Sequence, residues 1–151
     1  MTFYPMIKSV HTDNAPKVVG PYSQAISIGD WIYCSGQIGI DPKSGELVKG
    51  IEKQTEQVLE NLQTVLKEAG SDVKSVLKTT IFITDMKNYA TVNEIYGKIF
   101  KDHKPARSTV AVAALPKDAL VEIEAVAITH YEEVEGESGC ECGGECGCGG
   151  H

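Results

Sequence analysis

Arginine is nearly absent from this sequence. Of the 14 Lys and Arg residues, only Arg107 is an arginine. The formal charge is −7, but six glutamates and no Lys or Arg follow Tyr131, so residues 1–130 are close to neutral. Proteins that bind nucleic acid over a broad surface carry clustered Lys and Arg. The composition therefore argues against an extended nucleic-acid interface.

Cysteine is also scarce before the last twelve residues, where Cys34 is the only one. A disulfide scaffold distributes its cysteines through the fold to close long loops, so this class is excluded. No apolar run approaches the roughly 18 residues of a membrane-spanning helix. The first residues lack the basic flank and apolar stretch of a signal peptide, so we expect a cytoplasmic protein.

Phosphate-binding and metal-binding motifs are missing from residues 1–130. Neither GxxxxGK[ST] nor GxGxxG occurs, so no phosphate loop is predicted. His11, His103 and His130 are scattered without metal-ligand spacing, and no Ser-His-Asp arrangement can be argued. We therefore expect no metal site in this part of the chain.

The composition divides the chain into a domain over residues 1–130 and a Glu/Gly/Cys-rich tail over residues 131–151. The tail has too few apolar residues to fold alone, so we expect it to be flexible. It carries two Cys-x-Cys pairs, formed by Cys140, Cys142, Cys146 and Cys148. Thiolates at this density can chelate a soft ion such as zinc or copper(I). The alternative is a redox-sensitive tail with no specific ligand.

Apolar periodicity predicts the element order β-β-β-α-β-α-β-β. The expected strands lie near Ile7 and in "QAISIG", "DWIYCSGQI", "SVLKTTIFITD", "RSTVAVAAL" and "LVEIEAVAITH", with a hairpin turn at Gly29-Asp30; the helices span 51–69, with Gly70 as C-cap, and about 88–101, ended by Pro105. Two helices on one face of a mixed sheet make an α+β sandwich of two layers. Because the strands are apolar on both sides, we expect further copies of the chain to cover the other sheet face.

Arg107 stands at the start of a predicted strand in "KPARSTVAVAALP". A planar guanidinium can hold a carboxylate through two parallel hydrogen bonds, which an ammonium cannot match. Arg107 is therefore a candidate carboxylate ligand, the alternative being a chance surface ion pair. Glu122 and Glu124 alternate with apolar residues and share one strand face. If the two last strands pair, Glu122 lies close to Arg107 and could act as general acid or base.

Two glycine-containing segments, Gly20–Ala25 and Cys34–Gly39, are further candidates. Gly36 and Gly39 interrupt a strand pattern, so we expect the backbone there to approach another group closely. Tyr22 and Ser35 could contact a small polar ligand. The alternative is that these are bulge glycines beside a packed tyrosine.

Taken together, "GPYSQA", "SGQIGIDPKSGELV", "TVNEIY" and "PARSTVAVAALPKDALVEIEAVA" resemble the RidA (YjgF) family of reactive-intermediate deaminases. The resemblance runs from about Ile7 to Ile128. It implies a chorismate-mutase-like fold, a homotrimer with ligand clefts between subunits, and no cofactor. The implied activity is hydrolysis of 2-iminobutanoate and 2-iminopropanoate to 2-oxo acids and ammonia.

The same resemblance implies that Arg107 holds the substrate carboxylate and that Glu122 activates the attacking water. The remaining positions that it places along the cleft are Tyr22, Ser35, Gly36, Asn93 and Thr109. Many family members have cysteine at position 109, so chemistry that depends on a thiolate there is in doubt, whereas hydrolysis by an activated water does not need it. Two alternatives stay open: an endoribonuclease or translation inhibitor, and a noncatalytic ligand-binding or holdase trimer of the same fold.

Overall fold

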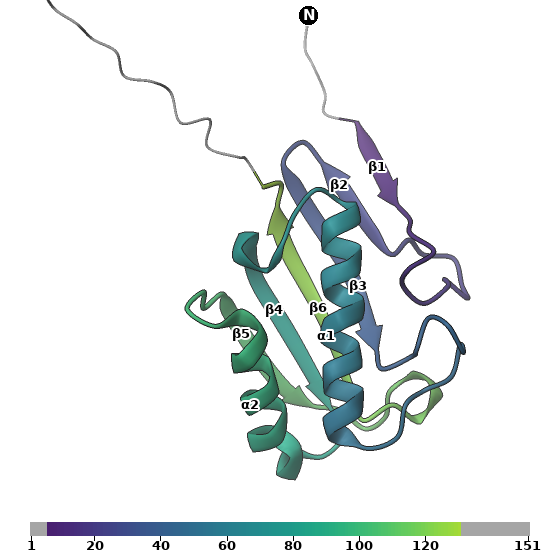
Figure 1. Cartoon of the computed structure of the whole chain (residues 1–151), viewed down its shortest axis with the longest axis vertical. Coiled ribbons are helices and arrows are strands. Elements are labelled where there is room, and N and C mark those ends of the chain that lie inside the picture. The colour runs from purple at the N-terminus through teal and green to yellow at the C-terminus, as the bar shows by residue number, and fades with distance from the viewer. Residues whose placement is uncertain (1–5, 131–151) are drawn as a thin grey trace, which may run out of the picture.

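The computed structural model describes residues 6–130 of the 151-residue chain, as six strands and two α-helices in one α+β unit (Figure 1). The elements are β1 (Ile7–Val10), β2 (Ala25–Ile28), β3 (Trp31–Ile38), α1 (Ile51–Glu68), β4 (Val76–Ile83), α2 (Tyr89–Phe100), β5 (Ala106–Ala111) and β6 (Val121–Ile128). Their order along the chain is the predicted one. None of the helices within residues 6–130 is long and apolar enough to cross a membrane.

The strands form one mixed sheet in the order β1-β2-β3-β6-β4-β5. All neighbours are antiparallel except β4 and β5, which are parallel and joined through α2. The expectation that β5 and β6 pair is wrong, because β4 lies between them. The crossover through α2 places β5 on the outer side of β4, and β6 fills the position between β3 and β4.

Both helices cover the same face of the sheet (Figure 1), as predicted for a two-layer sandwich. On β6, Val121, Ile123, Ala125 and Ala127 are buried and the intervening residues are more exposed, because successive strand residues point to opposite faces. The buried side joins the apolar stripes of α1 and α2 in one hydrophobic core.

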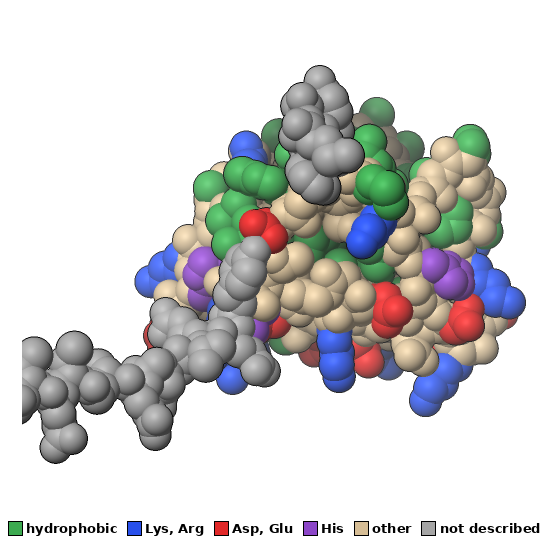
Figure 2. Space-filling view, turned by 90° about the horizontal axis from the view of Figure 1, so that it is seen from above, with side chains coloured by type: hydrophobic (Ala, Val, Ile, Leu, Met, Phe, Trp, Pro, Cys, Tyr) green, Lys and Arg blue, Asp and Glu red, His purple; other side chains and the backbone are tan. Residues whose placement is uncertain are grey.

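The sheet face that points away from the helices is left with exposed apolar side chains. Trp31 and Tyr33 are each 49% exposed and Val110 is 42% exposed. Figure 2 looks down on the end of the molecule where β1 begins and β6 ends, and apolar side chains gather along its upper side, away from the helices. We call this face the open face.

The helix ends follow local backbone rules. Gly70, two residues after the end of α1, has a φ of 79°, and its amide donates to the Lys67 carbonyl, so the predicted glycine cap is confirmed. α2 ends at Phe100, where Lys101 takes a φ of 53°. The expectation that Pro105 ends this helix is wrong, because the chain leaves the helix four residues earlier.

Candidate active site

Four of the predicted site residues line one cavity of about 450 Å³ at the open face. They are Tyr22, Ser35, Gly36 and Glu122. β6 contributes Glu122, β3 contributes Ser35 and Gly36, and the loop before β2 contributes Tyr22. We call this space the Glu122 cavity.

Gly36 makes room for the Glu122 side chain. The pairing of β3 with β6 shifts register between Cys34 and Gln37, which marks a bulge. A Cβ atom added to Gly36 would overlap the Glu122 carboxylate, and one added to Gly39 would lie 2.8 Å from the Cα of Gln54. The predicted close approach at both glycines is confirmed, and at Gly36 the approaching group is the candidate catalytic carboxylate.

Burial raises the pKa of Glu122 above its ordinary value, and the Glu124 carboxylate raises it further. The predicted placement of both glutamates on one strand face is confirmed, since both line the Glu122 cavity. A carboxyl group with a raised pKa binds a proton more readily near neutral pH, as a general acid or base requires.

Tyr22 and Ser35 contribute differently to this cavity. Tyr22 is 51% exposed, so its ring is available to a ligand. The Ser35 hydroxyl donates to the Ser23 carbonyl at 2.6 Å, and the Ser35 amide donates to the Gln24 carbonyl at 2.9 Å. Because the hydroxyl hydrogen is engaged, Ser35 offers a ligand an acceptor oxygen rather than a donor.

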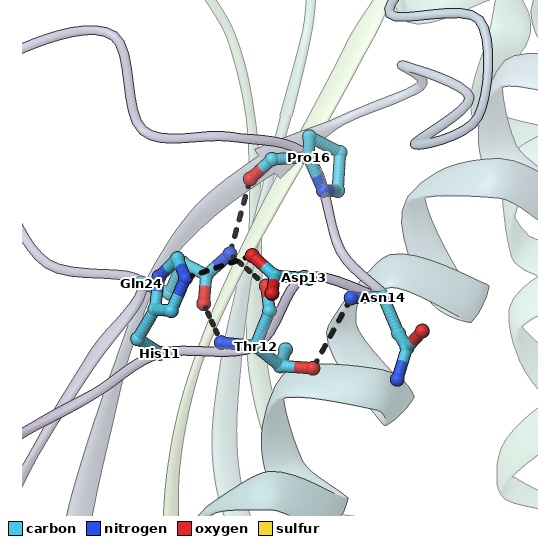
Figure 3. A network of polar contacts seen from close by, with 6 residues as sticks. All are labelled: His11, Thr12, Asp13, Asn14, Pro16 and Gln24. Carbon is cyan, nitrogen blue, oxygen red and sulfur yellow. Dashed lines mark hydrogen bonds and ion pairs between the residues drawn. The ribbon is translucent and has the colours of Figure 1, made fainter.

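Gln24, which sequence reasoning did not single out, fixes the loop before β2 (Figure 3). Its side chain is 1% exposed and accepts from the Thr12 amide at 2.7 Å. Its amide nitrogen donates to the carbonyls of Thr12 at 3.0 Å and Pro16 at 3.1 Å. Gln24 also lines the Glu122 cavity. The available signal was a glutamine directly before an apolar strand, within the quoted motif "GPYSQA".

Arg107 and Asn93 lie together in a second cavity of about 450 Å³, beside α2. Arg107 Nη2 donates to Asn93 Oδ1 at 2.8 Å and to the Tyr89 hydroxyl at 3.1 Å. The Cζ atom of Arg107 lies 4.9 Å from the ring centre of Tyr96 and 5.9 Å from that of Tyr89. We call this the Arg107 pocket.

No carboxylate within residues 6–130 forms an ion pair with Arg107. Among the described residues, the side chain of Arg107 contacts neutral groups: the Asn93 amide, the Tyr89 hydroxyl and the aromatic rings of α2. The alternative of a chance ion pair is therefore wrong for the described part of the chain. The positive charge of Arg107 is therefore not neutralised by a carboxylate of the described residues.

Tyr89 and Tyr96 lie on α2 with Asn93 and were not among the predicted site residues. Positions 89, 93 and 96 are spaced by four and three residues, which places their side chains on one helix face. That spacing was the signal that could have linked both tyrosines to Asn93.

The structure separates Arg107 from Glu122 within one subunit. Arg107 is in register with Thr79 of β4, whereas Glu122 is in register with Phe82. Arg107 and Glu122 are therefore about 10 Å apart across the sheet, which is two strand spacings, and about 10 Å apart along the strands, which is three residues. Their side chains also point to opposite faces, since Arg107 contacts α2 and Glu122 lines the cavity of the open face. The expectation that they meet through β5–β6 pairing is wrong.

Thr109 follows Arg107 by two residues on β5 and is half-buried. Its hydroxyl oxygen is buried and has no hydrogen-bond partner among the described residues. Thr109 therefore lies on the Arg107 side of the sheet and can contribute a hydroxyl but no thiolate.

Neither a metal site nor a nucleophilic cysteine is supported by residues 6–130. No group of three His, Cys, Asp or Glu side chains could hold a metal ion there. Burial raises the pKa of Cys34 to about 12, so this thiol is protonated and a poor nucleophile. The cysteine pairs of the tail lie outside the described residues.

Comparisons with known proteins give the chain its family. A family model described as Endoribonuclease L-PSP matches residues 12–129. A human protein named 2-iminobutanoate/2-iminopropanoate deaminase is 50% identical over 120 residues, which cover 79% of this chain and 88% of the human one.

Solved structures agree. YyfA of the Rid protein family from Yersinia pestis shares 52% identity with a TM-score of 0.81, over 82% of this chain and all of that chain. TdcF from E. coli, solved with bound serine, shares 40% identity with a TM-score of 0.78, over 82% of this chain and 99% of that chain. The chain therefore belongs to the Endoribonuclease L-PSP family, which is the RidA (YjgF) family.

Proposed function

We propose that this protein hydrolyses 2-imino acids to 2-oxo acids and ammonia, at sites that each combine the Glu122 cavity of one subunit with the Arg107 pocket of another. The observation that carries the proposal is Arg107 itself. It is the only arginine of the chain, it is oriented by α2, and it has no carboxylate partner among the described residues.

A composite site follows from the separation of the two halves. Arg107 and Glu122 point to opposite faces of one sheet, so a small ligand cannot touch both within one subunit. The exposed apolar side chains of the open face supply a reason for association, because their burial between copies is favourable. A homotrimer is the closed assembly that we expect.

The proposed reaction is a water addition followed by loss of ammonia. Arg107 holds the substrate carboxylate through two hydrogen bonds, which fixes the imine carbon near Glu122. The Glu122 carboxylate takes a proton from water while the water oxygen bonds to that carbon. The carbon–nitrogen double bond becomes a single bond as the imine nitrogen takes this proton from Glu122. In the resulting amino alcohol, Glu122 passes the hydroxyl proton to the nitrogen, and the carbon–nitrogen bond breaks to release ammonia and the 2-oxo acid. The chemistry needs no cofactor.

Most of the other predicted residues line the two halves. Tyr22 and Ser35 offer a ring wall and an acceptor oxygen in the Glu122 cavity, and Asn93 holds Arg107. The buried Thr109 hydroxyl, two residues along β5 from Arg107, has no hydrogen-bond partner among the described residues. The human relative's name states this activity, and the serine in TdcF is a small molecule with the carboxylate that the proposal requires.

A coupled assay tests the activity. An amino-acid oxidase generates 2-iminobutanoate in place, and release of 2-oxobutanoate is followed with and without the protein. We expect the wild-type protein to accelerate this release over the spontaneous rate. No acceleration with 2-iminobutanoate or 2-iminopropanoate would contradict the proposal.

Substitutions at Arg107 and Glu122 test the roles of the Arg107 pocket and the Glu122 cavity separately. We expect Arg107→Lys to lower kcat/KM about ten- to a hundredfold, because a charge-assisted hydrogen bond contributes about 1.5–3 kcal/mol and lysine cannot form the paired contact. Glu122→Gln should lower kcat while 2-oxobutanoate still binds. An Arg107→Lys protein with wild-type affinity and rate would mean that Arg107 does not hold the carboxylate.

The family description favours RNA cleavage as a second candidate. RNA binding of this kind should weaken steeply as salt concentration rises, because phosphate contacts release counterions. Cleavage of labelled RNA that survives in the Glu122→Gln variant would assign that activity to another site. The near-neutral charge of residues 1–130 gives the deaminase the stronger support.

A further inference from the structure

Tyr96 stands between the buried core and the Arg107 pocket. Its side chain is 6% exposed, although α2 is an outer layer of the fold. The ring stacks on Phe100 with centroids 4.3 Å apart and an interplanar angle of 22°. The ring thus packs face to face with Phe100 in the core and also lines the Arg107 pocket.

The Tyr96 hydroxyl is anchored to the sheet. It lies 2.7 Å from the hydroxyl of Thr79, which is fully buried on β4. Thr79 is in register with Arg107 on the neighbouring strand β5, so the residue that binds the Tyr96 hydroxyl lies directly beside Arg107 in the sheet. A ring held by burial, stacking and a buried hydrogen bond has little freedom to tilt.

The guanidinium of Arg107 lies over this ring, with Cζ 4.9 Å from the ring centre. A cation within about 6 Å of an aromatic ring centre is attracted to its face. The hydrogen bonds to Tyr89 and Asn93 involve only the Nη2 atom of Arg107. The rest of the guanidinium packs against the face of the Tyr96 ring.

We propose that Tyr96 is a positioning residue for Arg107. The ring face orients the guanidinium for the substrate carboxylate, and the hydroxyl fixes the ring to Thr79 without acting on the ligand. The positioning concerns Arg107 alone, while its consequence for catalysis rests on the proposed deaminase function.

Substitutions at Tyr96 separate the ring from the hydroxyl. We expect Tyr96→Leu to weaken 2-oxobutanoate binding and to raise KM about three- to thirtyfold, the range of a cation–π contact, with a smaller change in kcat. Tyr96→Phe keeps the ring, so affinity should stay within about threefold of wild type. It leaves the buried Thr79 hydroxyl unpaired, so Tm should fall, and adding Thr79→Val should restore much of it.

A buried residue of the same helix provides the matched control. Val92 is 2% exposed on α2 and has no contact with Arg107 among those described above. Val92→Ala should lower Tm without changing 2-oxobutanoate affinity. If Val92→Ala and Tyr96→Leu weaken binding equally at equal loss of stability, Tyr96 only packs the core and the proposal is overturned.

The single arginine allows a readout that does not depend on activity. Protein labelled with ¹⁵N-arginine gives one Nε–H signal in NMR, and a guanidinium over a ring face is displaced by the ring current. We expect this displacement in wild type, Tyr96→Phe and Val92→Ala, and its loss in Tyr96→Leu. An unchanged signal in folded Tyr96→Leu overturns the proposal. If wild type neither binds 2-oxobutanoate nor hydrolyses imines while the signal still depends on Tyr96, the positioning stands and the deaminase function fails.

Discussion

At the scale of single residues, Glu122 and Glu124 share the open face, and the second carboxylate raises the pKa of the first. As a general base, Glu122 must be deprotonated, so kcat/KM should be high above its pKa and lost as pH falls through it. Glu124→Gln removes the repulsion and lowers the pKa of Glu122. The acid limb of the kcat/KM profile should therefore move to lower pH.

A distant glutamate controls for charge alone. Glu94 lies on the outer surface of α2, 71% exposed and 3.1 Å from Lys98. Glu94→Gln should leave the acid limb in place, because it lies outside the Glu122 cavity. A limb that does not move in Glu124→Gln, or that moves to higher pH, would assign the titration to another group.

Residue-level features of the site were only partly predictable. Arg107 and Glu122 were proposed from sequence because their types and positions are unusual, one as the only arginine and the other on an apolar strand. Gln24 was missed because its three hydrogen bonds go to backbone groups, which leave no pattern in side-chain chemistry. Tyr96 was also missed, because the apolar side of a helix does not reveal which of its residues also line a pocket.

At the scale of elements, the bulge of β3 and the bare Cα of Gly36 make the space for Glu122. Gly36→Ala should displace the carboxylate and lower kcat at least as strongly as loss of one charge-assisted contact, about tenfold. Tm should fall less than in a core variant, because the cavity opens to solvent. In a Glu122→Ala background, Gly36→Ala should have little further effect on kcat, because the carboxylate that it would displace is already absent. An additive loss in both backgrounds would mean that Gly36 acts independently of Glu122.

The succession of strands and helices was predictable because each element shows in local periodicity and turn residues. The sheet order was not, because pairing depends on contacts between distant segments. β5 and β6 are neighbours in sequence, yet a parallel crossover puts β5 beside β4 and leaves β6 inside the sheet. The same crossover carries Arg107 away from Glu122, so the layout of the site could not follow from sequence neighbours.

At the scale of the whole molecule, the tail over residues 131–151 lies outside the described residues, and its role stays a prediction. Removal of residues 132–151 should leave imine hydrolysis unchanged, because every residue of the proposed site precedes residue 130. Its Cys-x-Cys pairs are candidates for binding a soft metal ion, the alternative being a redox-sensitive tail with no specific ligand. Metal analysis of purified full-length protein, before and after added zinc, should show more metal than the tail-deleted control. Equal metal content in both would contradict the metal prediction.

The central claim is that each active site joins Arg107 of one subunit to Glu122 of another. Complementation between two inactive variants tests it directly. Arg107→Lys and Glu122→Gln chains are co-expressed at equal levels, and imine hydrolysis by the mixed oligomers is compared with that of each variant alone. In a closed ring of subunits, an interface with both wild-type halves arises by random assembly at about one quarter of the sites.

We predict that the mixed oligomers recover about one quarter of wild-type activity, since only those interfaces carry both functional halves. The matched control is the double variant, Arg107→Lys with Glu122→Gln, mixed with an equal amount of wild type, which should give the same fraction. Mixed oligomers of the single variants that are no more active than either variant alone would show that Arg107 and Glu122 act within one subunit, and would contradict the composite site.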